Sequence, residues 1–192
     1  LGANWTRGTA YNDMPIVSNT AGYLTTPALE TWSAASFTAN QRAWVTMATT
    51  LAVIGQRAWI VFRVPAATAI DGYRVELLQA GTTIEAHLYR IATGVEIGVH
   101  IDLGIAAFTL GDFVGVDADG TLLTLWYGAS GATATIAGTW TDGGITTAGY
   151  TGIGYSTLGP WYTGPWPGAY SNVPPIPLSS VVAAYQPKWA AG

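Results

Sequence analysis

The sequence predicts an all-β fold: a two-sheet antiparallel β-sandwich of the jelly-roll kind. Between residues 56 and 155, short segments in which every second residue is apolar follow one another. This period of two is that of a strand with one buried face. Glycine-bearing turns separate the segments at a spacing of roughly ten residues, which favours a sandwich or barrel over a βαβ fold.

The expected strands begin near residue 43 and end near residue 155. They cover residues 43–51, 58–64, 73–77, 84–90, 95–101, 113–117, 121–127, 133–140 and 149–155. Asp71-Gly72 and Thr93-Gly94 are dipeptides typical of tight turns between them. The segment 117–120 resembles a calcium loop but lacks its length and its distal Glu, so a hairpin turn is the better interpretation. Residues 28–35 are the one place where a helical turn or two is expected.

Composition divides the chain into three zones. Residues 1–40 are expected to be an irregular N-terminal wrap, and residues 41–155 the β-sandwich domain. Residues 156–192 shift sharply to Pro, Gly and aromatic residues. Prolines at this density forbid a central strand, so this zone is expected to form an extended arm, followed by a last strand at 178–184 and a tail. The chain begins at Leu1 and not at Met, which indicates a processed or partial chain.

Charge is unusually scarce in this chain. Of its 192 residues, 49% are hydrophobic and only 9% are charged, against about 25% in typical soluble domains. The net charge is −4 and Lys188 is the single lysine, which argues against nucleic acid and anionic membrane surfaces as partners. No apolar run approaches the ~20 residues of a bilayer span. So few charges favour a surface packed into an assembly or apposed to neutral glycans.

Four segments carry a family resemblance. The first is a Gly-Tyr pair at residues 72–73, and the second is a Tyr-Arg pair at 89–90. The third is a hairpin that begins with Gly-Asp at 111–112 and ends with Leu-Thr-Leu-Trp-Tyr at 123–127. The fourth is a Gly-rich strand at 148–155. In this order they resemble the concanavalin A-like lectin/laminin G superfamily over about residues 40–156. The resemblance implies two antiparallel sheets and, often, sugar binding. Similar domains occur in tailed-phage virion proteins, as capsid decoration or tail components.

Catalysis is not expected. The hydrolases of that superfamily carry Glu-x-Asp-x-Glu on one strand, and this sequence has no such triplet. Retaining glycosidases need two carboxyl groups about 5–5.5 Å apart. Here the carboxylates are spread singly over several strands: Glu76, Glu85, Glu96 and Asp102. Glu96 and Asp102 share a face but are separated by roughly 20 Å along a strand.

The hairpin from residue 84 to residue 103 holds both histidines of the chain. A two-residue turn at Thr93-Gly94 places His87 opposite His100, and Glu85 opposite Asp102. Opposed like charges destabilise a sheet unless a cation intervenes, and two imidazoles with two carboxylates suit Zn²⁺ or a similar divalent ion. The alternative is a solvated face with the register shifted by two residues, where His87 and Asp102 form an ordinary pair. No other cofactor is expected, and the absence of cysteine rules out a disulfide framework and a thiolate metal site.

Aromatic residues in the arm are candidates for ligand or partner binding. They are Trp161, Tyr162, Trp166 and Tyr170. Amphipathic rings on a rigid loop serve both sugar platforms and protein contacts. The alternative is that they clamp the arm onto its own sandwich. Trp44, Trp59 and Trp126 fall in strands and are expected to pack in the core or on a sheet face.

The function expected from these observations is that of a non-catalytic structural or binding module. It would be a surface component of a larger assembly, such as a phage capsid decoration or tail protein, with a glycan as a further ligand. Its partners would be proteins of that assembly, in a homo-oligomer or a capsid or tail lattice, at a virion surface or outside the cell. The alternatives are a free lectin-like module and, third, a glycoside hydrolase or lyase. Nucleic acid and membrane insertion are not expected.

Overall fold

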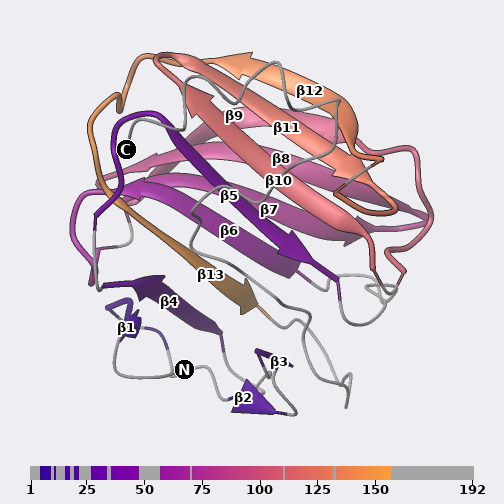
Figure 1. Ribbon diagram of the computed structural model, residues 1–192, viewed down its shortest axis with the longest axis horizontal. Helices are drawn as coiled ribbons and strands as arrows, with labels where there is room; N and C mark the ends of the chain where they lie inside the picture. Colours follow the sequence, from indigo (N-terminus) through magenta and orange to yellow (C-terminus); the bar gives the residue numbers. More distant parts are fainter. Residues whose placement is uncertain are drawn as a thin grey trace.

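The computed structural model describes residues 5–9, 11, 16–17, 20–21, 27–33, 36–47, 57–69, 71–109, 111–131 and 133–156. Across these ranges every regular element is a strand, and the strands form a β-sandwich (Figure 1). The predicted all-β, two-sheet fold is therefore confirmed. The strands are β1 (Trp5–Arg7), β2 (Ile16–Val17), β3 (Thr20–Ala21), β4 (Ala28–Trp32), β5 (Gln41–Thr46), β6 (Arg57–Val64), β7 (Gly72–Ala80), β8 (Thr83–Ala92), β9 (Val95–Asp102), β10 (Phe113–Asp119), β11 (Leu122–Gly128), β12 (Thr135–Thr141) and β13 (Tyr150–Ser156).

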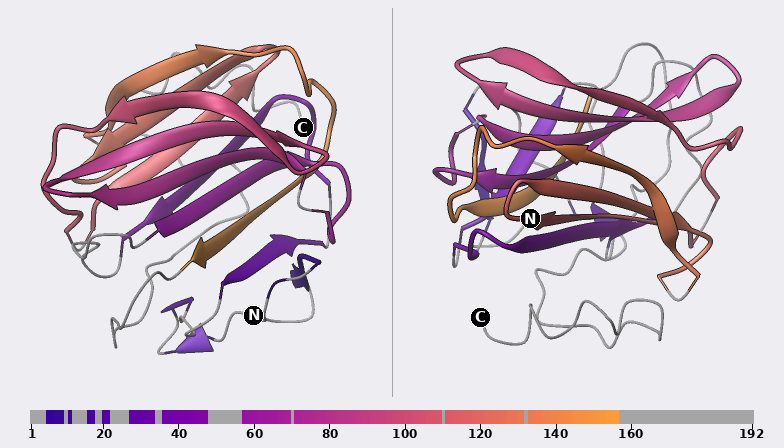
Figure 2. Two further views of the ribbon diagram at one scale, coloured as in Figure 1. Left: turned by 180° about the vertical axis from the view of Figure 1, so that it is seen from behind. Right: turned by 90° about the horizontal axis from the view of Figure 1, so that it is seen from above.

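Two antiparallel sheets make the two layers, which Figure 2 shows one above the other in its right-hand view. The large sheet has the order β1-β4-β13-β6-β7-β8-β9, and the small sheet has the order β12-β11-β10-β5. A separate pair joins β2 to β3. None of the described residues forms a helix long and apolar enough to cross a membrane.

The core lies between the two sheets and is built by alternation. On β7 and β8, every second side chain points inward and is fully buried, as at Val75, Leu77 and Leu88. Side chains of the small sheet such as Val114 and Leu125 meet them from the other layer. Burying each such aliphatic side chain contributes about 1.5–3 kcal/mol. The same alternation sends the remaining side chains of β6–β9 to the outer face of the large sheet, which becomes the face of interest.

The N-terminal part of the chain differs from expectation. Helical turns were expected at residues 28–35, and over the described residues 28–33 that prediction is wrong: β4 is a strand that pairs with β1 on one side and with β13 on the other. Ala28 lies in the main core, while Leu29 packs against Val61 and Val64 on the opposite face. A strand buried on both faces shows no alternation, and tertiary packing overrides local preference there. Thus β1 and β4 extend the large sheet into the zone expected to be irregular.

The turn at Thr93-Gly94 sets the register of the β8–β9 hairpin. Both residues have positive φ, 52° and 78°, as a two-residue type I′ turn requires. Ala92 therefore pairs with Val95, and His87 lies opposite His100. The predicted register is confirmed, and the shifted alternative that pairs His87 with Asp102 is wrong. The hairpin expected around residues 117–120 is also present, joining β10 to β11 with Gly120 at a φ of 58°.

Candidate functional site

The outer face of the large sheet carries a row of aromatic and charged side chains across β6, β7, β8 and β9. Adjacent strands contribute them at positions alternate to the core: Trp59, Arg74, Glu76, Glu85, His87, Tyr89, Glu96 and His100. Although they face away from the core, Trp59, Glu76 and His87 are buried, at 5%, 2% and 6% exposure. Buried polar groups on an outer face indicate an organised cluster and not a solvated surface.

Glu76 stands at the centre of this cluster and is surrounded by donors. The indole Nε1–H of Trp59 donates to Oε2 over 2.8 Å, and Nη1 of Arg57 donates to Oε1 over 3.0 Å. Nη2 of Arg74 lies 3.4 Å from Oε2. A buried carboxylate is costly unless donors replace its water, and here both oxygens have protein donors.

Arg74 connects Glu76 to a second carboxylate. Its Nη2 contacts Glu96 on β9 as well as Glu76 on its own strand. Its guanidinium also lies 5.0 Å from the Trp59 ring and 5.4 Å from the Tyr89 ring, in the range of a favourable cation–π contact. Glu76 and Glu96 lie on different strands, as expected, but sheet pairing brings both to one guanidinium nitrogen.

The two histidines lie face to face at the β8–β9 end of the row. The ring centroids of His87 and His100 are 3.8 Å apart with an interplanar angle of 10°. On His87, Nε2 is 2.8 Å from Oε2 of Glu85, and Nδ1 is 2.7 Å from the hydroxyl of Tyr89. Ligand atoms of Glu85, His87 and His100 all lie within 4.8 Å of one another. Three of the four residues predicted for a metal site are thus brought together.

Asp102 is the predicted ligand that does not join this group. It lies opposite Glu85 in the register, but its Oδ1 accepts a hydrogen bond of 2.8 Å from the backbone N–H of Gly104. Its carboxylate caps the turn after β9, so a position opposite Glu85 in the strand pairing was not enough to make Asp102 a member of the group. Metal binding itself stays a prediction.

Tyr89 links the histidine stack to Arg74. Burial, and next the Glu76 and Glu96 carboxylates, raise the pKa of Tyr89, while Arg74 and Arg57 act in the opposite direction. Its hydroxyl is therefore protonated at neutral pH and can donate to or accept from His87. Gly98, its partner on β9, has no side chain, and a Cβ there would meet the Tyr89 ring at 2.8 Å. The ring consequently lies close to the backbone of β9.

Sequence reasoning missed the Trp59, Arg74 and Glu76 part of the site. Trp59 was expected to pack on a sheet face, which it does, but its indole N–H also holds Glu76. The available signal was the charged pair Arg74 and Glu76 on the non-core positions of a strand in the middle of the sheet. The arm residues Trp161, Tyr162, Trp166 and Tyr170 lie outside the described residues, so their binding role stays a prediction.

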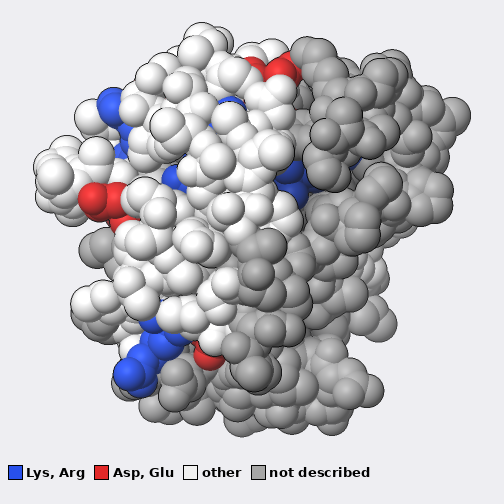
Figure 3. All heavy atoms as spheres, turned by 60° about the vertical axis from the view of Figure 1, so that its left-hand side comes forward, with Lys and Arg blue, Asp and Glu red and all other residues white. Residues whose placement is uncertain are grey.

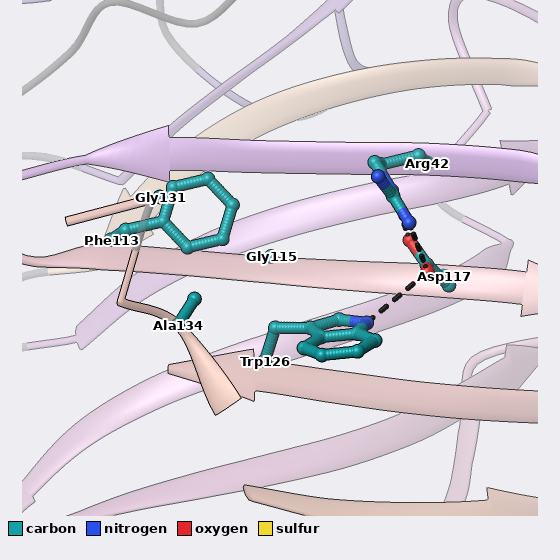
Figure 4. A pocket seen from close by; sticks show the side chains of 7 residues that line it. All are labelled: Arg42, Phe113, Gly115, Asp117, Trp126, Gly131 and Ala134. Carbon is teal, nitrogen blue, oxygen red and sulfur yellow. Dashed lines mark hydrogen bonds and ion pairs between the residues drawn. The ribbon is translucent and has the colours of Figure 1, made fainter. Parts of the chain in front are cut away.

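A hollow lies on the outer face of the small sheet (Figure 4). Phe113 and Trp126 form its apolar walls. Both oxygens of Asp117 accept hydrogen bonds from Arg42, and Oδ2 also accepts one of 3.1 Å from Nε1 of Trp126. The polar side chains drawn in Figure 4 thus bind one another, which is the arrangement of a structural cluster.

No protein-family model matches this chain, and no curated protein is similar to it in sequence. Solved structures share its fold. The carbohydrate binding module CBM66 from Bacillus subtilis superposes with a TM-score of 0.59 at 12% identity, covering 88% of this chain and 92% of that one. A β-1,3-1,4-glucanase (lichenase) derived from a mouse hindgut metagenome gives 0.57 at 8% identity, covering 88% and 83%. A legume lectin-like domain from Entamoeba histolytica gives 0.51 at 9% identity, covering 89% and 91%. The chain therefore shares the jelly-roll β-sandwich fold of these structures.

Proposed function

We propose that this chain is a non-catalytic carbohydrate-binding module and that the outer face of β6–β9 binds the glycan. The observation that carries the proposal is the half-buried ring of Tyr89, which Arg74 connects to Trp59 across adjacent strands, beside accessible carboxylates. Rings offer a flat apolar surface to sugar C–H groups, and carboxylates and imidazoles pair with hydroxyls. The likeness to structures named as a carbohydrate binding module and a lectin-like domain supports the proposal at the level of fold.

The accessible end of the row is its β8–β9 end. Trp59 is 5% exposed and so positions Glu76 without being a platform itself. The side chains of Glu85 and Glu96 are 34% and 44% exposed, and His100 is exposed as well. Two accessible carboxylates repel acidic polymers, which favours a neutral glycan as the ligand.

The state of the carboxylates supports a binding role over a catalytic one. A glycosidase needs a carboxylic acid with a proton to give and a second carboxylate with a free lone pair. Glu76 and Glu96 share Arg74 between them, and Glu76 accepts hydrogen bonds from two further donors. Glu76 is only 2% exposed, so its carboxylate is not accessible to a scissile bond.

The experiment is binding to a panel of insoluble and soluble polysaccharides, neutral and acidic. We expect the wild type to be retained on at least one neutral polymer. The affinity for that polymer should be at least tenfold weaker in Tyr89→Ala and nearly unchanged in Tyr89→Phe, because the Phe ring keeps the stacking surface. Thr139→Ala, an exposed position on β12 of the small sheet, is the control and should bind like the wild type. Failure to bind any polymer, or equal binding by Tyr89→Ala, would contradict the proposal. Release of reducing ends from the bound polymer would contradict the non-catalytic part.

A second candidate is a surface component of an assembly, such as a phage capsid decoration or tail protein at a virion surface. Large apolar side chains are exposed on the strands that end the two sheets: Val95 and Ile97 on β9, at 57% and 51%, and Ile136 on β12, at 52%. Figure 3 shows one face of the molecule, on which few of the described atoms belong to charged residues. Exposed sheet edges with apolar side chains are typical protein-contact surfaces.

Light scattering over a concentration series tests this candidate. Self-association that is lost in Val95→Asp, and kept in Thr139→Asp, supports it. The candidate would be contradicted if the protein stayed monomeric at all concentrations and also failed to bind virus particles isolated from its own source.

A further inference from the structure

We propose that Glu85, His87 and His100 bind one transition-metal dication, with Zn²⁺ as the reference ion. The site lies at the accessible end of the β8–β9 hairpin, and it stands independently of the proposed glycan binding. Its basis is a donor set from two adjacent strands that is already close enough to chelate.

The backbone places the three donors without any loop. His87 and His100 are cross-strand partners in the register, and Glu85 precedes His87 by two residues on the same face. The turn at Thr93-Gly94 fixes that register through two positive φ angles. A hairpin pinned in this way holds the three Cα positions rigidly, so that metal binding needs side-chain rotation alone.

The distances fit a chelate after a small adjustment. The donor atoms lie within 4.8 Å of one another, and His87 Nε2 is 2.8 Å from Glu85 Oε2. With metal bonds of about 2.0–2.2 Å, tetrahedral ligand atoms lie roughly 3.3 Å apart. The His87–Glu85 pair must therefore open slightly, and the parallel stack of the two rings must open so that each ring points a nitrogen at the ion. His100 is exposed and can make this rotation, whereas His87 is buried and stays in place.

The partner of His87 on its other nitrogen matches what a metal ligand needs. Nδ1 contacts the Tyr89 hydroxyl at 2.7 Å. A hydroxyl can accept as well as donate. When a metal replaces the proton on Nε2, Nδ1–H can donate to Tyr89, and such an outer partner fixes the ring and its tautomer. The metal would take the place of the proton that now links Nε2 to Glu85.

The chemistry of the donors selects the kind of ion. Two imidazole nitrogens and one carboxylate oxygen suit Zn²⁺, Cu²⁺ or Ni²⁺ and do not suit Ca²⁺ or Mg²⁺, which prefer all-oxygen sets. Arg74 is engaged by Glu76 and Glu96, so it does not compete for Glu85. Three protein ligands and an exposed His100 leave a fourth position open to solvent, as in sites that accept a further ligand.

The test is titration calorimetry with Zn²⁺ on the 192-residue chain, stripped of metal with a chelator and freed of any affinity tag, since the chain has only two histidines of its own. We expect one Zn²⁺ per chain, and no heat with Ca²⁺ or Mg²⁺. His100→Ala should weaken binding by at least about tenfold, and Glu85→Gln by a similar factor. Asp102→Asn is the matched control, because that carboxylate caps Gly104, and its affinity should stay within about threefold of the wild type.

Folding is checked in each variant by its circular dichroism and melting temperature. His100→Ala is preferred to His87→Ala because the side chain of His100 is exposed. Zn²⁺ should raise the melting temperature of the wild type and of Asp102→Asn but not of His100→Ala, since a ligand stabilises the state that binds it. Absence of Zn²⁺ binding by folded wild type up to millimolar concentration, or unchanged affinity in folded His100→Ala, would overturn the proposal. Glycan binding is measured separately, in the presence of a chelator, so that the glycan proposal and the metal proposal can each be contradicted without the other.

Discussion

The imidazole of His87 lies parallel to that of His100 on the neighbouring strand, with ring centroids 3.8 Å apart. This stack results from one turn, Thr93-Gly94, whose two positive φ angles leave a single register for β8 and β9. The same register places Tyr89 against Gly98 and brings Glu96 within reach of Arg74. A backbone feature of two residues thus organises the whole accessible end of the candidate site.

Gly94→Ala should lower the free energy of unfolding by about 1–2 kcal/mol, the cost of a left-handed conformation for a residue with a Cβ. A Cβ at Gly94 meets no atom within 4 Å, so the cost is one of backbone conformation. Gly143→Ala is the matched control, because a Cβ there makes an ordinary contact of 3.6 Å with Thr121 and its φ is not positive. Urea unfolding measures the stability of both variants. Equal stability of the two would refute the claim that the turn at Thr93-Gly94 fixes the register of β8 and β9.

Glu76→Ala should destabilise the fold by about 3–5 kcal/mol, because it leaves buried positive charge on Arg74 and an unpaired indole N–H on Trp59. Glu96→Gln removes the other, more exposed partner of Arg74 and should cost less than about 1 kcal/mol. Chemical denaturation measures both values. A loss below that of Glu96→Gln would mean that Glu76 does not organise the cluster.

Stability should fall in alkaline solution. Burial above all, with Asp142 adding to it, raises the pKa of Tyr73, against the opposing effects of the Ile145 N–H and Arg63. Burial also raises the pKa values of Tyr11, Tyr89 and Tyr127. The unfolded chain then loses these protons at lower pH than the folded protein does. Stability is therefore full below the ordinary tyrosine pKa of about 10 and is lost as the pH rises above it.

The urea midpoint measured from pH 8 to pH 11 checks this sign. Tyr73→Phe should show a shallower decline above pH 10 than the wild type, although it is less stable at pH 8 because it loses the hydrogen bond to Asp142. A midpoint that stays level or rises up to pH 11 would show the reasoning to be wrong.

The sequence predicts the fold where one face of each strand is buried and the other is polar. This holds for β7 and β8, while the alternation of β9 gave the histidine pairing in advance even though its apolar Val95 and Ile97 are 57% and 51% exposed. It fails for β4, where Leu29, Glu30 and Thr31 are all buried and no alternation remains. It fails again at the Trp59–Glu76 hydrogen bond, which joins residues 17 positions apart. A polar position on a strand normally indicates solvent, so the burial of Glu76 depends on neighbouring strands that no single segment reveals.

The most direct test of carbohydrate binding by the β6–β9 face is a titration of isotope-labelled protein with a neutral oligosaccharide, drawn from a polymer that retains it. Backbone amide shifts are followed by NMR. We predict that the perturbed amides cluster at Tyr89, Glu96, Gly98 and His100 on β8 and β9, with β10 and β11 unaffected. Perturbations confined to β10 and β11, or no perturbation at saturating sugar, would contradict the assignment of this face.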